Sequence, residues 1–383
     1  MRPLEGLRVI DLTHVLAGPF ATHQLRCLGA EVVKIERPGH GDVMRALAAR
    51  PELGGITPGF AALNAGKKSV TLDLKSEAGR ADLLRLVATA DVFVENFRPG
   101  AAARLGLDPA AIRAARPGIV CCSISGWGQS GDMAGLRAYD HVVQAATGMM
   151  ALQGTDPSGP PIKVGFPVID IATGMTAASA ILAALLRRAR GDQADITLDV
   201  SMADSAALLM AGTVAQVRAT GKPPPRIGNR GFVGSPGADT FATRDGHVSV
   251  AANTMGQFRR LCAVLDRPDL SAPPHLPDGL PDGAFLADMA GETLRAGLAE
   301  AFARAEAAPL EAALIAQGVP AARVRDLHEY LSELYPRMGG IDLPGGGGAL
   351  GAGWRWLGEA PIEGGPPPRL GEHNAEFLAA PPG

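Results

Sequence analysis

The run Arg8-Val9-Ile10-Asp11-Leu12, followed by residues 18–28 and by Glu31-Val32-Val33-Lys34-Ile35, decides the fold of this chain. The first and last segments are short and apolar, as buried strands are, whereas residues 18–28 have a helical pattern that Gly29 closes. A strand, a helix and a second strand in succession form the βαβ unit from which parallel sheets are built.

The same alternation continues through the first two hundred residues. Further strands are predicted at residues 69–74, 91–95, 119–124 and 196–200, and further helices at residues 76–87 and 170–188. Short apolar strands that alternate with helices are typical of a parallel sheet covered on both faces. The sequence therefore predicts an α/β fold with a Rossmann-like large domain and a mostly parallel sheet.

A change of composition near residue 220 predicts a second domain. Residues 220–226 include three consecutive prolines and have linker composition, and residues 240–250 then have the pattern of a hairpin on the Asp245-Gly246 turn. Helical patterns follow at residues 257–265, 286–305 and 310–317. We predict a large domain over residues 1–219, a smaller α+β domain over residues 228–327, and a return of residues 328–383 to the large domain.

The segment that returns is rich in Gly and Pro. Its last element is predicted at residues 372–378, and its Trp354 and Trp356 predict that it packs against the rest of the protein.

Composition excludes several classes of function. With 383 residues and a formal net charge of −3, the chain lacks the basic surface of a nucleic-acid-binding protein. Its four cysteines form no metal-binding or redox pair and suit a reducing cytosol. The N-terminus lacks the apolar stretch of a signal peptide, and the apolar run after Asp170 is judged too short to span a membrane. We expect a cytoplasmic protein without a metal, a nucleic-acid partner or a membrane partner.

Asp170 stands where the longest apolar run begins, and it is the strongest candidate for a chemical role. Burying an ionisable group beside so much apolar sequence is costly unless something pairs with it. One interpretation is an N-cap, in which the carboxylate accepts hydrogen bonds from free N–H groups of a helix. The other is a carboxylate nucleophile at a helix N-terminus, in a partly dry site.

The turn after the first strand argues against a dinucleotide. Glu36 lies about where a ribose-binding acid follows a Rossmann turn, but residues 12–19 lack the G-x-G-x-x-G pattern that lets the backbone approach a pyrophosphate. Basic residues do follow the predicted strands, at Arg37, Lys75 and Arg98. Since loops at the carboxyl ends of parallel strands share one crevice, these side chains can converge on a phosphate-rich ligand such as a nucleotide or coenzyme A.

Several fragments, taken in order, resemble the class III CoA-transferases, the CaiB/BaiF family that includes formyl-CoA transferase. They are Asp11-Leu12-Thr13-His14-Val15-Leu16-Ala17-Gly18-Pro19, Val32-Val33-Lys34-Ile35-Glu36-Arg37-Pro38, Asn96-Phe97-Arg98-Pro99-Gly100, Ser125-Gly126-Trp127-Gly128-Gln129, Tyr139-Asp140 and Asp170-Ile171-Ala172-Thr173-Gly174. The resemblance spans almost the whole chain.

The resemblance implies an activity and a set of site residues. Asp170 matches the family's nucleophile, which carries a covalent aspartyl intermediate while CoA moves from an acyl-CoA thioester to a carboxylic acid. It also implies CoA contacts at Arg37, Lys75 and Arg104, a residue near the nucleotide at Arg137, and an acid near the active site at Asp140. Acyl-CoA and a carboxylic acid are substrates, no cofactor is tightly bound, and the family fold is an interlocked homodimer.

Three local features leave alternatives open. Leu16 stands where formyl-CoA transferase has Gln, so formyl and oxalate specificity is not implied. Racemases of the same superfamily have a His where this chain has Tyr139, whose pKa near 10 makes it a poor base, and this favours a transferase over a 2-methylacyl-CoA racemase. Tyr139 and Asp140 also fit a plain helix start with a capping acid, and a non-catalytic nucleotide-binding protein is a further alternative.

The same reasoning extends to the groups that would stabilise an oxyanion. Backbone N–H groups of the loop at residues 126–131, or of the helix start at Asp170, are expected to serve as donors.

Overall fold

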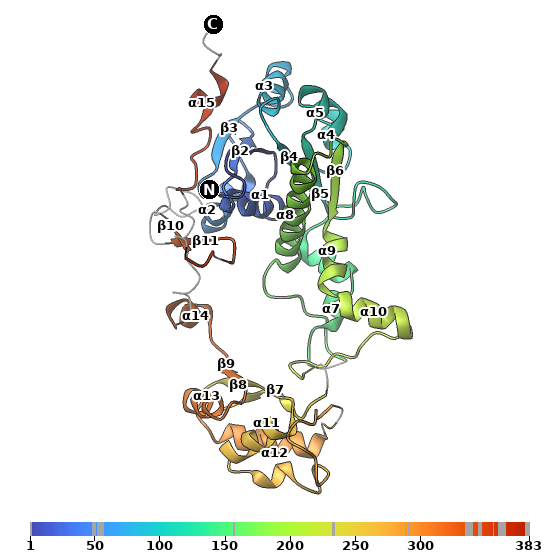
Figure 1. Ribbon diagram of the computed structural model, residues 1–383, viewed down its shortest axis with the longest axis vertical. Coiled ribbons are helices and arrows are strands. Elements are labelled where there is room, and N and C mark those ends of the chain that lie inside the picture. Colours follow the sequence, from blue (N-terminus) through green and yellow to red (C-terminus); the bar gives the residue numbers. More distant parts are fainter. Residues whose placement is uncertain are drawn as a thin grey trace. The chain divides into compact units, whose positions relative to one another are not determined.

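The computed structural model (Figure 1) describes residues 2–47, 51, 57–155, 158–231, 234–287, 289, 291–333, 340–343, 347–354, 356–358 and 365–379. The chain forms two compact units. The first comprises Met1–Met150, Lys163–Pro223 and Arg337–Gly383, and the second comprises Ala151–Ile162 and Pro224–Pro336. These units differ from the expected boundaries because residues 151–162 and 328–336 belong to the second unit.

A six-stranded sheet forms the centre of the first unit. Its strands are β1 (Arg8–Asp11), β2 (Glu31–Glu36), β3 (Lys68–Thr71), β4 (Val92–Glu95), β5 (Val120–Ser125) and β6 (Ile196–Ser201). All neighbours are parallel, in the order β3-β2-β1-β4-β5-β6. This is the strand order of the Rossmann fold, and it confirms the predicted parallel sheet.

Both faces of the sheet are covered, which explains why its strands are apolar without alternation. Val9 packs into a core with α1 (Ala17–Cys27) and α8 (Val168–Ala189). Its neighbour Ile10 packs into a second core with α3 (Glu77–Val87) and α5 (Pro109–Ala115). Successive side chains of a strand point to opposite faces, so each central strand has to supply apolar residues to two cores.

The helices of the first unit begin at recognisable capping signals. The side chains of Thr57, Ser76, Asp108 and Ser201 accept hydrogen bonds from the first turns of α2, α3, α5 and α9. The helices up to β6 are α1 (Ala17–Cys27), α2 (Pro58–Asn64), α3 (Glu77–Val87), α4 (Ala101–Arg104), α5 (Pro109–Ala115), α6 (Asp140–Ala146), α7 (Met149–Leu152) and α8 (Val168–Ala189). After β6 come α9 (Met202–Leu209) and α10 (Ala211–Thr220). A short 3-10 turn covers Val43–Arg45, between β2 and α2.

Helix α8 corrects two expectations. It has 22 residues with a mean hydropathy of 1.8 over its most apolar stretch, so by length and composition it could span a membrane, and the judgement that the run is too short was wrong. Yet 44% of that stretch is buried within the protein, where it packs on α1, β5, β6 and α9 as a core helix does. The helix begins at Val168 after Pro167, so Asp170 lies inside the first turn and is not the N-cap.

The second unit is built on a three-stranded antiparallel sheet. Strands β7 (Gly237–Ala242) and β8 (His247–Ala252) form the predicted hairpin, and β9 (Ala321–Arg323) pairs with β8. Its helices are α11 (Met255–Val264), α12 (Glu292–Ala303), α13 (Ala307–Ala316), α14 (Leu327–Glu333) and a 3-10 turn over Pro268–Ser271. Helix α12 begins six residues later than the expected Leu286, which instead lies in the core.

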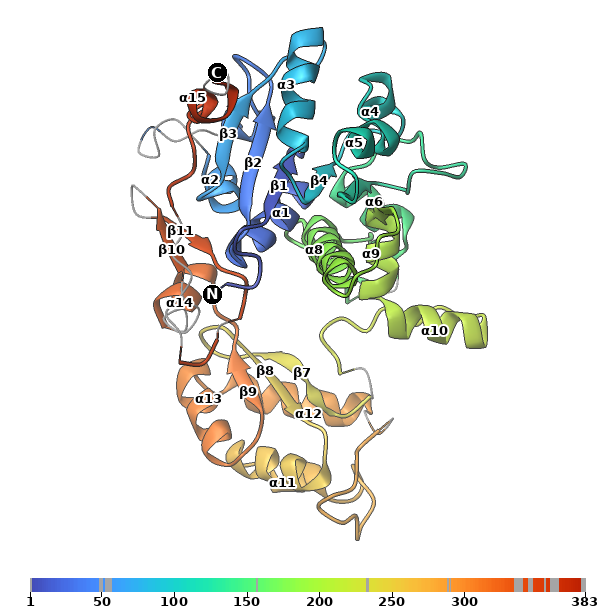
Figure 2. The same ribbon diagram turned by 45° about the horizontal axis from the view of Figure 1, so that its top comes forward.

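The C-terminal segment adds a hairpin and a last helix. The hairpin consists of β10 (Gly340–Leu343) and β11 (Gly347–Leu350), and α15 (Asn374–Leu378) lies beside the edge strand β3 (Figure 2). The Asn374 side chain accepts from the Thr71 N–H at 2.8 Å, and the His373 N–H donates to the Ser69 carbonyl at 3.0 Å. Trp354 and Trp356 contact each other edge to face but stay about half exposed.

The contact between α1 and α8 depends on the absence of a side chain at Gly174. A Cβ there would lie 2.7 Å from the Ala17 carbonyl oxygen, so the two helix backbones approach too closely for any larger residue. Figure 2 shows the two helices side by side.

We expect Gly174→Ala to destabilise the protein by about 1–3 kcal/mol, because the added methyl overpacks a backbone contact. Gly212→Ala in α10 is the matched control, since nothing lies within 4 Å of its added Cβ. Alanine is the better helix former by about 0.8–1 kcal/mol, so the control should be neutral or stabilising. Chemical denaturation of both variants tests this, and a Gly174→Ala variant as stable as the control would contradict the close packing.

Candidate active site

Two cavities lie at the carboxyl edge of the parallel sheet. The larger, of about 640 Å³, is lined by residues that follow β1, β2 and β3, together with Phe97 and Leu105. The smaller, of about 370 Å³, contains Asp170. His14, Val43 and Phe97 line both cavities, so the two are contiguous. This edge, where the strand order reverses at β1, is the usual ligand site of open α/β sheets.

The predicted basic residues divide between the two cavities. Arg37 and Lys75 line the larger cavity, whereas Arg98 and Arg137 line the smaller one. Arg104, at the exposed end of α4, lines neither cavity, although the next residue, Leu105, lines the larger. The structure thus places Arg37 and Lys75 in one cavity, and Arg98, Arg137 and Asp170 in the other.

The carboxylate of Glu36 is fully used within the protein. Its Oε1 accepts from the Arg45 Nε at 2.7 Å and from the Asp42 N–H at 2.9 Å. Its Oε2 accepts from the Arg45 Nη2 and from the Ser69 hydroxyl, both at 2.7 Å. An acid with these partners cannot also hold ribose hydroxyl groups, which agrees with the missing glycine pattern in the first turn.

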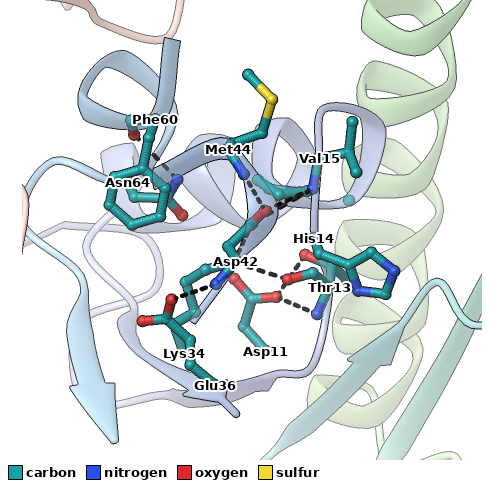
Figure 3. Close-up of polar contacts among 12 residues, drawn as sticks. Asp11, Thr13, His14, Val15, Lys34, Glu36, Asp42, Met44, Phe60 and Asn64 are labelled. Carbon is teal, nitrogen blue, oxygen red and sulfur yellow. Dashed lines mark hydrogen bonds and ion pairs between the residues drawn. The ribbon is translucent and has the colours of Figure 1, made fainter. Parts of the chain in front are cut away.

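Buried charges support the turn that follows β1 (Figure 3). Asp11 accepts from the Thr13 hydroxyl within this turn. It also accepts from the Thr22 hydroxyl and from Lys67 at 3.1 Å, and both members of this ion pair are completely buried. Burial alone would raise the pKa of Asp11, but the Lys67 and Lys34 ammonium groups and the two hydroxyls outweigh it and lower this pKa to about 2. Burial lowers the pKa of Lys67 to about 8.

His14 is a residue of this turn that sequence reasoning did not select. Its backbone N–H donates to the Asn96 Oδ1 at 3.0 Å, and the Asn96 amide donates back to the His14 carbonyl at 2.8 Å. Burial lowers the pKa of the imidazole, so it is neutral at pH 7. Its place in the loop that follows the first strand is the available sequence signal.

Asp170 is half-buried, and it faces the smaller cavity from the first turn of α8. Burial, and secondarily the charge of Asp140, raise its pKa to about 7. A carboxylate that water solvates poorly and that still ionises near neutral pH is suited to nucleophilic attack.

Asp140 is the group that caps α8. Its Oδ2 accepts from the Ile169 N–H at 2.7 Å and from the Asp170 N–H at 3.1 Å, and its Oδ1 accepts from the Gln144 amide at 2.5 Å. The interpretation of Asp140 as a cap of its own helix is therefore wrong, although α6 does start there. The expectation of oxyanion donors at the Asp170 helix start is also wrong for these two N–H groups, because Asp140 occupies them.

The lining of the smaller cavity combines apolar and polar residues. Leu16 and Tyr139 line it with Asp170, and the Tyr139 side chain is 66% exposed. His141 stacks parallel to Tyr139 at 6.4 Å between ring centroids. In the loop at residues 126–131 only Gly126 lines the cavity, and a Cβ on it would lie 2.2 Å from the Ala138 Cβ.

The cysteines and metal-binding residue types form no second site in the part of the chain that the structure describes. No group of three His, Cys, Asp or Glu side chains there could hold a metal ion. Burial raises the pKa of Cys121 to about 11 and that of Cys262 to about 12, so these thiols stay protonated.

Comparison with known proteins relates this chain to a known family. The chain matches CoA-transferase family III over residues 4–374. It is 34% identical to the succinate–glutarate CoA-transferase of Agrobacterium fabrum, over 98% of this chain and 95% of the relative. It is 37% identical to the acetyl-CoA:oxalate CoA-transferase of Acetobacter aceti, over 90% and 88%. A solved CAIB/BAIF family protein from Brucella suis has a TM-score of 0.87 and 32% identity over 98% of both chains.

The raised pKa of Asp170 predicts how the stability of the protein depends on pH. When an acid has a higher pKa in the folded chain than in the unfolded chain, the protein loses stability as pH rises between the two values. For Asp170 this window runs from 3.8, its ordinary value, to about 7. We therefore expect Asp170→Asn to raise the melting temperature, and to raise it more at pH 8 than at pH 5. Asp132→Asn, at an exposed acid, is the control. Calorimetry that finds the same gain at both pH values would contradict the raised pKa.

Proposed function

The chain belongs to CoA-transferase family III, and from this membership and the geometry of the two cavities we propose that Asp170 is its covalent nucleophile. In this proposal, CoA moves from an acyl-CoA thioester to a carboxylic acid through an aspartyl intermediate. The observation that supports this proposal most directly is the Asp170 carboxylate, which is half-buried and has a pKa raised to about 7. Its cavity is contiguous with the larger cavity, which Arg37 and Lys75 line.

The two cavities suit the two ends of an acyl-CoA molecule. The phosphates of CoA bind in the larger cavity, where the Arg37 fork and the Lys75 ammonium supply positive charge. The flexible arm passes His14, Val43 and Phe97, and the thioester reaches Asp170. A neutral imidazole at this junction adds no charge that would hold a phosphate there instead of in the larger cavity.

The first half-reaction moves CoA onto the enzyme. A carboxylate oxygen of Asp170 attacks the thioester carbonyl carbon, the carbon–sulfur bond breaks, and an aspartyl mixed anhydride and a CoA thiolate form. The thiolate then attacks the Asp170 carbonyl carbon. The donor acid leaves with one oxygen that came from Asp170, and Asp170 is now a CoA thioester.

The second half-reaction repeats these steps with the acceptor. The acceptor carboxylate attacks the aspartyl thioester, expels the thiolate and forms a second anhydride. The thiolate attacks the acyl carbon of the acceptor and releases acyl-CoA, while one acceptor oxygen stays on Asp170. Remote binding of CoA keeps its thiolate in place throughout, so its return is effectively intramolecular.

Residues around Asp170 support this chemistry. Asp140 holds the first turn of α8 in place and contributes to the raised pKa of Asp170, so the nucleophile is both oriented and poorly solvated. The apolar lining that includes Leu16 limits access of water, which would hydrolyse both the anhydride and the thioester. Gly126 is the loop residue whose backbone faces this cavity, and we propose it as an oxyanion donor.

The acceptor proposed here is a small dicarboxylic acid. Arg98 and Arg137 line the cavity of Asp170, and neither has an ion-pair partner among the described residues. A second carboxylate on the substrate supplies that partner. Relatives are named for succinate, glutarate and oxalate, which are all dicarboxylic acids.

Transfer of oxygen tests this mechanism. With an ¹⁸O-labelled acceptor, we expect one label to enter Asp170 in the first turnover and to leave on the donor acid in a later one, as detected by mass spectrometry.

Asp170→Ala should abolish transfer while the protein stays folded, and hydroxylamine added with acyl-CoA should modify Asp170 in the wild type. A panel of acceptors should favour succinate and glutarate over butyrate. Full activity in Asp170→Ala would refute the nucleophile.

A second assay distinguishes the racemase alternative from the transferase. A racemase needs a base that removes the α-proton, and the position expected to supply that base is taken here by Tyr139, which is exposed. Fast exchange of the α-proton of a 2-methylacyl-CoA in deuterium oxide, without any acceptor acid, would favour the racemase.

We also propose that the protein is an interlocked homodimer. In the described part of the chain, the sides of α8 and α9 away from the core carry exposed large apolar side chains, namely Met175, Leu186, Leu208 and Leu209, each at least 50% exposed. Exposed apolar surface of this kind is typical of an interface.

Interlocked chains cannot part without unfolding, so two differently tagged dimers should exchange no subunits under native conditions. Mixed dimers within minutes would exclude the interlocked arrangement.

A further inference from the structure

Asp42 lies where the two cavities meet and is almost completely buried. Its carboxylate accepts from the Val15 N–H at 3.2 Å and from the Met44 N–H at 3.0 Å, and it pairs with the Lys34 ammonium at 3.1 Å. Asp42 lines the larger cavity, and the next residue, Val43, lines both. Figure 3 shows these contacts around the turn after β1.

Val15 has a backbone conformation that it does not adopt easily. Its φ angle is +71°, in the left-handed region, which a β-branched residue occupies only when its surroundings impose it. The neighbours of Val15 on both sides, His14 and Leu16, line the cavity of Asp170. The shape of this cavity therefore depends on an unfavourable backbone conformation being maintained.

One buried ion pair holds both sides of the strained turn. Lys34 donates to the Thr13 carbonyl at 2.7 Å, and Asp42 accepts from the Val15 N–H. The side chains of Lys34 and Asp42 are 0% and 1% exposed, so each of these hydrogen bonds involves a charged group out of water, where such bonds are strong.

We infer that Asp42 is a positioning residue, which fixes the turn at residues 13–16 against the loop at residues 37–43 and thereby sets the place of the acyl group relative to Asp170. The inference rests on the proposed function for its catalytic consequence. Since Arg37 and Lys75 hold the nucleotide independently of the turn, loss of Asp42 should displace the thioester without releasing CoA.

Asp42→Asn separates this role from a merely stabilising one. We expect kcat to fall by about tenfold or more, because a small displacement of reacting groups is costly, while the affinity for CoA measured by calorimetry changes much less. Adding Val15→Gly should recover most of kcat, because glycine adopts a positive φ without support. It should not recover the melting temperature, because Lys34 still lacks its carboxylate partner.

Asp108→Asn is the matched control. Asp108 also accepts backbone N–H bonds, at the start of α5, but it lines neither cavity, so kcat should not change. Wild-type kcat in Asp42→Asn, or equal recovery of kcat and melting temperature on adding Val15→Gly, would overturn the inference.

Hydrogen exchange decides the role of Asp42 independently of catalysis. We expect faster amide exchange over residues 12–17 in Asp42→Asn than in the wild type, with β5 unchanged. Unaltered exchange in this segment would overturn the inference. A wild-type protein that transfers no CoA would end the proposed function instead, and the exchange result would still stand.

Discussion

The hydrogen bonds from the first turn of α8 to Asp140 are the interaction on which the site depends. A helix N-terminus leaves N–H groups without intrahelical partners, and here a carboxylate from α6 satisfies two of them. The same carboxylate contributes to the raised pKa of Asp170, since it lies close enough to accept a hydrogen bond from the Asp170 N–H. One side chain therefore sets the position of the candidate nucleophile and helps to set its ionisation. The close contact of α1 with α8 at Gly174 then places this helix against the turn after β1.

The buried charges at the carboxyl edge follow from the order of the strands. β1 lies between β2 and β4, so the turn after β1 stands at the reversal of the sheet and forms part of both cavities. Such a turn cannot be stabilised by an apolar core alone, because its backbone groups need partners. Asp11, Lys34 and Asp42 supply them, and each of these charges is itself paired or hydrogen-bonded, as burial requires.

The architecture of the parallel sheet could be predicted from the sequence, because apolar strands and helical periodicity are local signals. Strands β1, β2, β4, β5 and β6 lie within one or two residues of their predicted positions, whereas β3 ends three residues early. Helices α2, α5 and α9 were missed although Thr57, Asp108 and Ser201 cap them, because the caps precede short segments with little periodicity.

The candidate site was only partly predictable. Asp170 could be selected because a lone acid beside an apolar run is conspicuous, and Arg37 and Lys75 could be selected because they follow strands. The role of Asp140 could not be predicted, since its partners lie about 30 residues away in a different helix and no local pattern connects them. The left-handed conformation of Val15 was equally hidden, because the Asp42 carboxylate that accepts from its N–H lies 27 residues further along the chain.

The attachment of the C-terminal segment to β3 has a consequence for biosynthesis. Ser69 and Thr71, on the edge strand of the sheet, are bonded by His373, Asn374 and the Gly371 N–H. These partners follow β3 by about 300 residues in the chain, and the first unit is interrupted by the whole of the second. Until residues 371–374 have been made, the edge of β3 lacks these hydrogen bonds, and an open strand edge is a template for aggregation. A product truncated before residue 371 would therefore expose the strand edge that these residues protect.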